Sequence, residues 1–282
     1  MIVYIDGKYE KEENAKVSVN DRAYVFADGV YEGFRVYNEK IFKYEEHKTR
    51  FQRSLDELRI NHTLTNEIEE IYEELKKANG YDKETLFYYI HVTRGQSPRS
   101  HEFPQKDTPV GIYAFLSVKE LNIQKYNEGI SVCTVPDNRW ARCDIKCISL
   151  TANCLASQIA IDNGCPEALF VHDGVITEGT RTNVFFIKNN EVYTHAKTNR
   201  ILAGVTRNTV VELCKENDIT VHEFPLTYDK LEDMDEAFLT GTSEEITPIV
   251  QINGKKVGTG EVGTLTKKLQ KLFKEEVQKC CY

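Results

Sequence analysis

The chain has 282 residues, 40% of them hydrophobic and 28% charged, which is ordinary for a globular protein and, at about 150 residues each, long enough for two domains. Its formal net charge is −8 and its Lys and Arg residues are dispersed, so no clustered basic face indicates a nucleic-acid partner. No apolar run approaches the roughly 20 residues that span a bilayer, and the first residues lack a signal-peptide pattern. We therefore expect a cytoplasmic protein without a membrane partner.

The N-terminal part predicts short strands separated by turns, over residues 2–5, 16–19, 30–37 and 40–42. Two amphipathic helices are predicted next, over residues 45–58 and 66–78, and Gly80 follows the second as a stop signal. Residues 86–93 and 110–116 are rich in aromatic and branched side chains and predict two further strands.

Residues 118–129 lack clear periodicity and predict a linker between an N-terminal α+β domain (1–117) and a C-terminal α+β domain (130–282). The C-terminal part mixes strands and helices without regular βαβ spacing. Its predicted strands cover residues 130–135, 168–171, 184–187 and 237–239, and its predicted helices cover residues 149–163, 207–217 and 262–278. We therefore expect an α+β protein of two domains, with the cleft between them as the natural ligand site.

Eight cysteines occur, and none forms a Cys-x-x-Cys pair. Their spacings do not suit a zinc site, and a chain of this length does not need disulfide bonds to fold. We expect reduced cysteines that serve as small core or surface residues, and no bound metal.

Lys146 lies in a mostly apolar context just before a predicted helix, in the segment Arg142-Cys143-Asp144-Ile145-Lys146. An amine kept from water has a lowered pKa, which suits it to form a Schiff base with an aldehyde cofactor. Taken alone, the segment also fits a solvated surface lysine.

Glu178 stands in Thr177-Glu178-Gly179, before small polar residues and a predicted strand. A carboxylate at such a position can lie beside a buried ligand, and a pyridine ring needs one to keep its nitrogen protonated. The segment also fits a hairpin turn with a solvated glutamate.

Two loops of small residues, 202–207 and 239–248, could bind an anion. The first enters a predicted helix, where backbone N–H groups and a nearby hydroxyl favour a phosphate. Each loop could equally be a helix cap.

Six short motifs follow one another along nearly the whole chain: Asp28-Gly29-Val30-Tyr31-Glu32, Glu46-His47-x-x-Arg50, Lys146, Thr177-Glu178-Gly179, Gly204-Val205-Thr206-Arg207 and Thr240-Gly241-Thr242. In this order they resemble the class IV (fold type IV) pyridoxal-phosphate enzymes, which include D-amino-acid aminotransferases, branched-chain aminotransferases and aminodeoxychorismate lyases. One such match is common by chance, whereas six in order are not. The resemblance implies a two-domain fold with pyridoxal 5'-phosphate at the domain interface.

The resemblance also implies the role of each cofactor ligand. Lys146 is the catalytic lysine that holds the cofactor, and Glu178 faces the pyridine nitrogen. The cofactor phosphate is bound by Arg50, Val205, Thr206 and Thr242.

Arg99 and His101 lie two residues apart in a predicted loop, so both can reach one ligand group, and a guanidinium and an imidazole beside a tyrosine hydroxyl suit a carboxylate. The segment resembles the Arg-x-His loop by which D-amino-acid aminotransferases hold the substrate α-carboxylate, with a tyrosine that matches Tyr31. There the loop comes from the partner subunit, which implies a homodimer. Trp140 also resembles that subgroup. The implied reaction is ping-pong transamination between a D-amino acid and a 2-oxo acid, of the type D-alanine plus 2-oxoglutarate.

Two features keep alternatives open. Gly33 and Arg35 resemble the branched-chain aminotransferase pattern, which makes an L-amino-acid aminotransferase the nearest alternative, ahead of an aminodeoxychorismate lyase. Arg181 stands where the enzymes of this family usually have a serine-rich stretch. It either points into the substrate pocket, favouring a dicarboxylate, or is a solvated loop residue.

Overall fold

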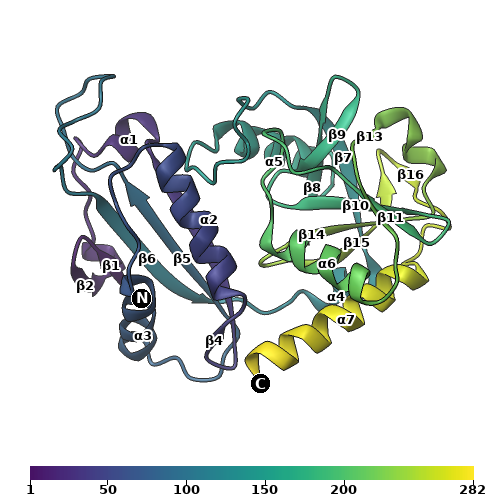
Figure 1. The fold of residues 1–282 in the computed structure, drawn as a ribbon, viewed down its shortest axis with the longest axis horizontal. Helices are drawn as coiled ribbons and strands as arrows, with labels where there is room; N and C mark the ends of the chain where they lie inside the picture. Colours follow the sequence, from purple (N-terminus) through teal and green to yellow (C-terminus); the bar gives the residue numbers. More distant parts are fainter. The chain divides into compact units, whose positions relative to one another are not determined.

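The computed structural model describes residues 1–282, and the chain forms two compact units (Figure 1). The first unit contains Met1–Glu120, Ile145–Leu150 and Cys280–Tyr282, and the second contains Leu121–Asp144 and Thr151–Lys279. The segment Ile145–Leu150 therefore belongs to the first unit and not to the C-terminal part in which we expected it. The reason is backbone pairing: Tyr31 N donates to Lys146 O at 3.0 Å and Ile148 N donates to Gly29 O at 3.1 Å.

The division between the two units, after Glu120, falls within the linker expected over residues 118–129, and Ile123–Glu128 of that segment form helix α4. The side chain of Asn122 caps this helix by accepting a hydrogen bond from Lys125 N at 3.0 Å. Such a short helix has too few apolar residues to show a helical period in the sequence.

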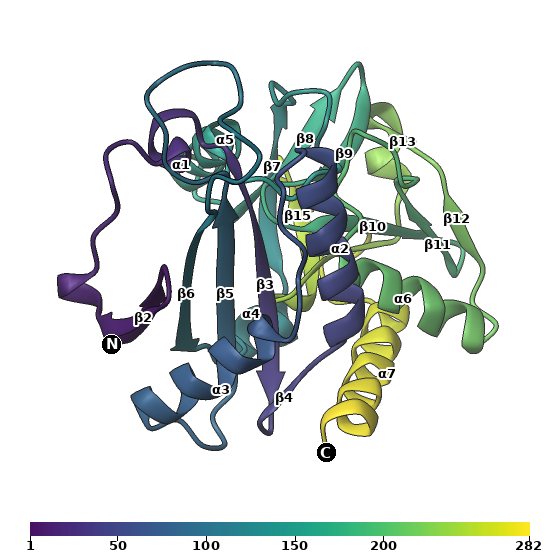
Figure 2. The ribbon, with the colours of Figure 1, turned by 60° about the vertical axis from the view of Figure 1, so that its left-hand side comes forward.

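The first unit contains a six-stranded antiparallel sheet with the order β2-β1-β6-β5-β3-β4. Its strands are β1 (Ile2–Ile5), β2 (Lys8–Lys11), β3 (Gly29–Tyr37), β4 (Lys40–Ile41), β5 (Leu86–Thr93) and β6 (Gly111–Val118). Its helices are η1 (Glu12–Asn14), α1 (Arg22–Phe26), α2 (Tyr44–Glu57) and α3 (Glu67–Asn79). In Figure 2 the strands β3, β5 and β6 lie side by side, as their pairing requires.

Alternation along β3 divides the first unit into a core face and an opposite face. Val30, Phe34 and Val36 are fully buried and form one cluster with Phe51 and Leu55 of α2. Burying each such side chain contributes roughly 1.5–3 kcal/mol, so helix and sheet hold each other in place. The opposite face carries a row of stacked aromatic rings: Tyr31 on Tyr89 and Tyr89 on Phe115.

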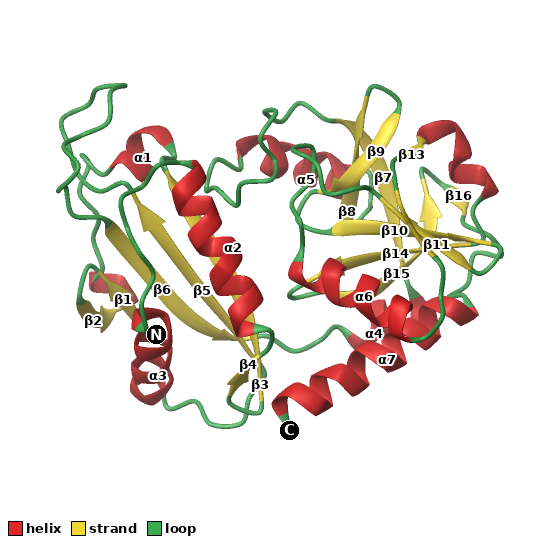
Figure 3. Cartoon of the chain, viewed as in Figure 1, coloured by secondary structure: helices red, strands yellow, loops and turns green.

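The second unit contains a ten-stranded mixed sheet, coloured yellow with the other strands in Figure 3. Its order is β12-β11-β10-β14-β15-β7-β8-β9-β13, and β16 pairs with β15. The strands are β7 (Ile130–Pro136), β8 (Glu167–His172), β9 (Val175–Gly179), β10 (Asn183–Lys188), β11 (Glu191–Thr194), β12 (Val221–Glu223), β13 (Leu226–Thr227), β14 (Glu236–Gly241), β15 (Glu245–Ile252) and β16 (Lys255–Lys256). The helices besides α4 are α5 (Thr151–Asp162), α6 (Val205–Glu216), η2 (Tyr228–Asp233) and α7 (Thr264–Cys281).

The α+β class and most of the expected elements are confirmed, and the strands over residues 2–5 and 86–93 are confirmed to the residue. The strand expected over 16–19 is wrong, because the alternation there buries neither apolar side chain: Val17 is 60% exposed and Val19 is 73% exposed. All eight cysteines are free thiols, six of them buried. None of the helices is both long enough and apolar enough to cross a membrane.

Candidate functional site

Lys146 lies on a short extended segment held between β3 and α2 of the first unit. Its carbonyl accepts from Tyr31 N at 3.0 Å, its N–H donates to Ser54 Oγ at 3.2 Å, and Cys147 forms an isolated bridge with Val30. The Nζ atom lies 4.2 Å from the centre of the Tyr31 ring, a cation–π distance. The lysine expected from the sequence is therefore half-buried and fixed against Tyr31, and it is not a solvated surface group.

Arg50 is held by a buried carboxylate on the neighbouring strand. Its Nε donates to Glu32 Oε2 at 3.0 Å and its Nη2 donates to Glu32 Oε1 at 2.7 Å. The Nδ1 atom of His47 lies 3.1 Å from the same Oε1. The Arg50 side chain is only 10% exposed, so it is not an ordinary surface arginine.

The charge of this cluster follows from its neighbours. Burial alone would raise the pKa of the fully buried Glu32 carboxyl, but Arg50, His47 and Lys146 lower that pKa by more, so it lies well below its ordinary range. Burial lowers the pKa of His47, and the cations Arg50 and Lys146 lower it further against the opposing effect of Glu32. The cluster therefore carries an ionised glutamate between cationic groups.

Glu178 lies near the end of β9 in the second unit and is buried, with 6% of its side chain exposed. Its Oε1 accepts from Arg139 Nη1 at 2.5 Å, and its Oε2 accepts from Asn183 Nδ2 and from Leu202 N, each at 3.0 Å. Glu178 is thus no solvated turn residue, contrary to the simpler interpretation of its sequence.

Burial raises the pKa of Glu178 to about 7, although Arg139 acts in the opposite direction. Arg139 has to neutralise two acids, since it also donates to Asp137 Oδ1 at 2.9 Å and to Asp137 Oδ2 at 2.8 Å. A carboxylate has about four acceptor positions, and three donors contact Glu178. One more donor, such as a protonated ring nitrogen, would complete the set.

Val205 and Thr206 begin α6, and their backbone N–H groups belong to the first turn, which lacks intrahelical partners. Gly204 precedes them at the N-cap, and a Cβ atom there would lie 2.2 Å from Asn183 Oδ1. The glycine is required because Asn183 bridges Glu178 and Leu202 O, to which its Nδ2 donates at 2.8 Å. One side chain, Asn183, therefore contacts both the buried carboxylate and the backbone just before α6.

Thr242 lies in the turn between β14 and β15 of the same unit. Thr240, which pairs with Asn183 across β14 and β10, is 1% exposed, and its hydroxyl is buried without a hydrogen-bond partner. Such a hydroxyl at the end of a strand fits an oxyanion ligand. Arg207, in the first turn of α6, is fully buried and donates to His195 O at 2.9 Å and to Glu223 Oε2 at 2.8 Å.

Arg181 lies on a turn built by a second buried acid, Glu167. One Glu167 oxygen accepts from Ala168 N at 2.9 Å and from both the N–H and the hydroxyl of Thr180, and the other accepts from Thr182 Oγ1 at 3.2 Å. The Arg181 side chain is 59% exposed, and it lies 3.9 Å from Glu167 and 3.9 Å from Glu244.

Arg99 and His101 lie in the loop after β5, and both are exposed. They share one neighbour: the Arg99 guanidinium lies 5.1 Å from the centre of the Phe26 ring, and the His101 ring lies 5.5 Å from it. Trp140 is 47% exposed, so it is not a core aromatic.

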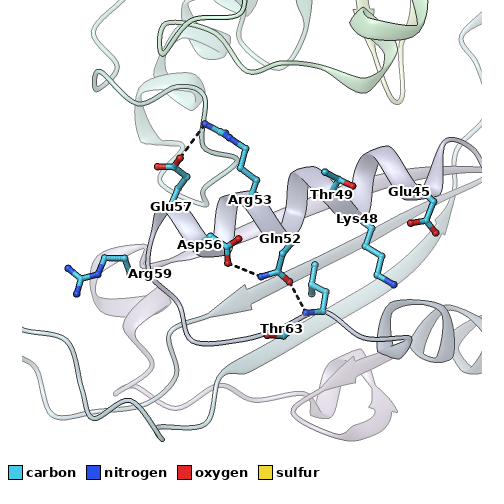
Figure 4. A pocket seen from close by; sticks show the side chains of 10 residues that line it. Glu45, Lys48, Thr49, Gln52, Arg53, Asp56, Glu57, Arg59 and Thr63 are labelled. Atoms are coloured by element: carbon cyan, nitrogen blue, oxygen red, sulfur yellow. Dashed lines mark hydrogen bonds and ion pairs between the residues drawn. The ribbon is translucent and has the colours of Figure 1, made fainter.

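Two surface hollows of the first unit are mixed in charge and contain neither Lys146 nor Glu32. The larger, of about 980 Å³, runs along α2, where Gln52 bonds with Asp56 and Leu64 N, and Arg53 faces Glu57 (Figure 4). The smaller, of about 400 Å³, lies beside Arg94 and Phe103. Neither has a set of convergent ligand groups.

Sequence reasoning gave no role to Arg139, Asn183 and Glu167. Arg139 contacts Glu178, Asn183 contacts Leu202 O and Glu167 contacts Thr180, each at a long separation in sequence, so no local spacing indicates these contacts. The only signal was proximity to a recognised motif: Asn183 follows the Glu178 motif by a few residues, and Arg139 lies shortly before Lys146.

Comparison with known proteins gives consistent matches over nearly the whole chain. The model of the amino-transferase class IV family matches residues 29–252. The D-alanine aminotransferase of Staphylococcus haemolyticus is 38% identical over 277 residues, covering 98% of both chains, and that of Bacillus licheniformis is 37% identical over 279 residues, covering 98% of this chain and 97% of the relative.

Solved structures of the same fold include branched-chain amino acid aminotransferases. That of Escherichia coli has a TM-score of 0.87 and 25% identity, covering 96% of this chain and 92% of that chain. Another branched-chain enzyme, solved with pyridoxamine 5'-phosphate, has a TM-score of 0.85 and 26% identity, covering 97% of this chain and 93% of that chain.

Proposed function

The chain belongs to the amino-transferase class IV family, and we propose that it transfers the amino group of a D-amino acid to a 2-oxo acid, as in D-alanine plus 2-oxoglutarate giving pyruvate plus D-glutamate. The observation that carries this proposal is the exposed pair Arg99 and His101 on one aromatic ring, in a chain 36–38% identical to D-alanine aminotransferases over its full length.

Enzymes of this family use pyridoxal phosphate, whose aldehyde takes up the amino group and whose protonated ring accepts electrons from the substrate. The residues present fit this group. A cationic lysine and arginine lie around Glu32 in the first unit, and the second unit has an acceptor position on Glu178 and an unpartnered Thr240 hydroxyl.

We assign the cofactor ligands accordingly. Lys146 would hold the cofactor, and Glu178 would bind its ring nitrogen. Its phosphate would be bound by Arg50, Val205, Thr206 and Thr242.

Lys146 would also move the proton. Its amine would take a proton from the substrate Cα as general base. The backbone bonds of Lys146 to Tyr31 and Ser54 fix the side from which this amine acts. Arg139 contributes by lowering the pKa of Glu178 from the value that burial alone would give, because its positive charge favours the ionised carboxylate.

The same fixed lysine explains how the substrate's handedness is chosen. The Cα–H bond has to point toward the amine, so the position of the carboxylate decides whether a D- or an L-amino acid fits. We assign the carboxylate to Arg99, His101 and the Tyr31 hydroxyl. Because Arg99 and His101 are exposed on the single chain, we propose a homodimer in which this loop serves the partner subunit's site.

Arg181, at 59% exposure between two acids, is assigned as a contact for a second substrate carboxylate rather than for the cofactor.

A branched-chain L-amino-acid aminotransferase is the second candidate. Gly33 favours it, and the reason for this glycine lies in the chain itself: a Cβ atom there would meet the Phe87 ring at 2.7 Å. The glycine thus reflects packing of β3 against β5 and does not by itself decide the substrate.

A single half-reaction tests the proposal. The purified, cofactor-loaded protein is mixed separately with D-alanine, D-glutamate and L-leucine, and loss of the cofactor's visible absorbance is followed. We expect the D-amino acids to bleach it and L-leucine not to. Bleaching by L-leucine alone would overturn the proposal in favour of the second candidate. Lys146→Ala should abolish bleaching by every substrate.

A further inference from the structure

Helix α1 has a single buried charge, Arg22, which is 4% exposed. Its Nε donates to Asp28 Oδ2 at 2.8 Å. Its Nη1 donates to two backbone carbonyls of the loop after β5, Ser100 O at 2.7 Å and Glu102 O at 3.3 Å. These carbonyls lie on either side of His101, so one guanidinium holds the backbone around that residue.

Asp28 also binds a second arginine at the base of the same loop. Arg94 Nε donates to Asp28 Oδ2 at 2.8 Å, and Arg94 Nη2 donates to Asp28 Oδ1 at 3.0 Å. Arg94 further donates to Leu58 O at 2.7 Å and to Arg59 O at 2.8 Å. Its guanidinium lies 3.7 Å from the centre of the Phe103 ring. The start of the loop, through Arg94, and its middle, through Arg22, are thus tied to one carboxylate.

Phe26 connects the arginine to the exposed side chains. It lies four residues after Arg22, one turn along α1, and the Arg22 guanidinium lies 4.8 Å from its ring centre. The same ring contacts Arg99 and His101. Figures 1 and 2 both draw this loop beside α1. Backbone and side chains of the loop therefore rest on a single turn of helix.

We propose that Arg22 and Phe26 are positioning residues, which fix the geometry in which Arg99 and His101 meet the substrate carboxylate. This inference rests on the proposed function, in which Arg99 and His101 bind that carboxylate. Arg22 needs its fork of donors, because it contacts a carboxylate and two carbonyls at once. A lysine could keep the ion pair with Asp28 but could not make all three contacts.

The test compares Arg22→Lys and Phe26→Leu with the unchanged protein, each loaded with cofactor. The substrates are D-alanine and D-alaninamide, which differ only in the carboxylate. We expect the preference for D-alanine to fall about ten- to hundredfold in both variants, since small misplacements of binding groups have effects of this size. The rate with D-alaninamide should stay within about twofold, which a general loss of structure would not allow.

The matched control is Tyr24→Leu, on the same helix turn but 72% exposed, which should leave both rates unchanged. The double variant with Arg99→Met should show non-additive effects, because Arg22 acts through the same loop. If Arg99→Met leaves the preference for D-alanine unchanged, the proposed function itself fails. If Arg99→Met lowers it while Arg22→Lys and Phe26→Leu do not, the positioning roles fail and the function stands.

Discussion

Arg139→Met tests how the charge of Glu178 is maintained. The arginine stacks on the Phe170 ring at 4.1 Å and donates to Glu178 and Asp137, and all three polar side chains are under 10% exposed. Methionine keeps the apolar contact and removes the cation. At a separation of about 4 Å and an effective dielectric constant of about 20, the lost attraction is about 4 kcal/mol. That energy corresponds to roughly a thousandfold decrease in the ionised fraction of Glu178.

The assay is the half-reaction with D-alanine, measured from pH 6 to pH 9.5. Since the pKa of Glu178 is already about 7, the Glu178 carboxyl of the variant should be largely protonated at neutral pH. Its rate should fall about a hundredfold or more at pH 7 and recover as the pH rises. Thermal unfolding should also show a cost of about 3–5 kcal/mol, because a buried pair loses one partner.

The control variant is Arg142→Met, whose arginine is 40% exposed and pairs with Asp144 at the surface. It should change neither the pH profile nor the rate. If Arg139→Met kept the wild-type rate and pH profile, Arg139 would not govern the ionisation of Glu178.

Two further variants test the two units separately. Gly204→Ala should displace Asn183, weaken cofactor retention and destabilise the second unit by about 1–3 kcal/mol. Cofactor absorbance and thermal unfolding measure the two effects. The control Gly241→Ala should be tolerated, because no atom lies closer than 3.4 Å to the Cβ atom that it adds. Glu32→Gln should destabilise the first unit most at neutral pH. The pKa of Glu32 is lower in the folded than in the unfolded protein, so the ionised side chain stabilises the fold fully above the unfolded pKa. This stabilisation is lost as the pH falls through the folded pKa. The difference in urea midpoint between wild type and Glu32→Gln should therefore shrink on acidification, and a constant difference would contradict the assigned charge.

Elements with a strong internal pattern could be predicted from the sequence. Strand β5 buries every second side chain, and α2 and α3 present apolar faces to the sheet, so alternation and helical period located them. Strand β2 (Lys8–Lys11) was missed, because its side chains are exposed or half-buried and only its pairing with β1 makes it a strand. The false strand over 16–19 is the converse case: an alternating pattern with no neighbouring strand to bury it.

The residues of the candidate site were likewise predictable only in part. Lys146, Arg50 and Glu178 were named from short motifs, and the structure gives each of them buried or half-buried partners. Arg139 and Glu167 could not be named, because their partners are fixed by the sheet of the second unit and not by spacing along the chain. The sequence did not indicate Arg22 either. Its hydrogen-bond acceptors are backbone carbonyls far along the chain, and every residue has a carbonyl, so no residue type marks them.

Glu32 and Glu178 show how the same side chain acquires opposite properties. Both are buried, yet the pKa of Glu32 is lowered and that of Glu178 is raised. Glu32 has Arg50, His47 and Lys146 around it, whereas Glu178 shares its one arginine with Asp137. A further cation beside Glu178 would therefore be stabilised and would lower its pKa in turn. Near neutral pH, the proton that Glu178 holds without a cofactor is the one that a pyridine nitrogen needs. We therefore expect cofactor binding at pH 7 to exchange few protons with the buffer in wild type. Calorimetry in buffers of different ionisation heat measures this exchange, and uptake or release of about one proton per cofactor would refute the transfer.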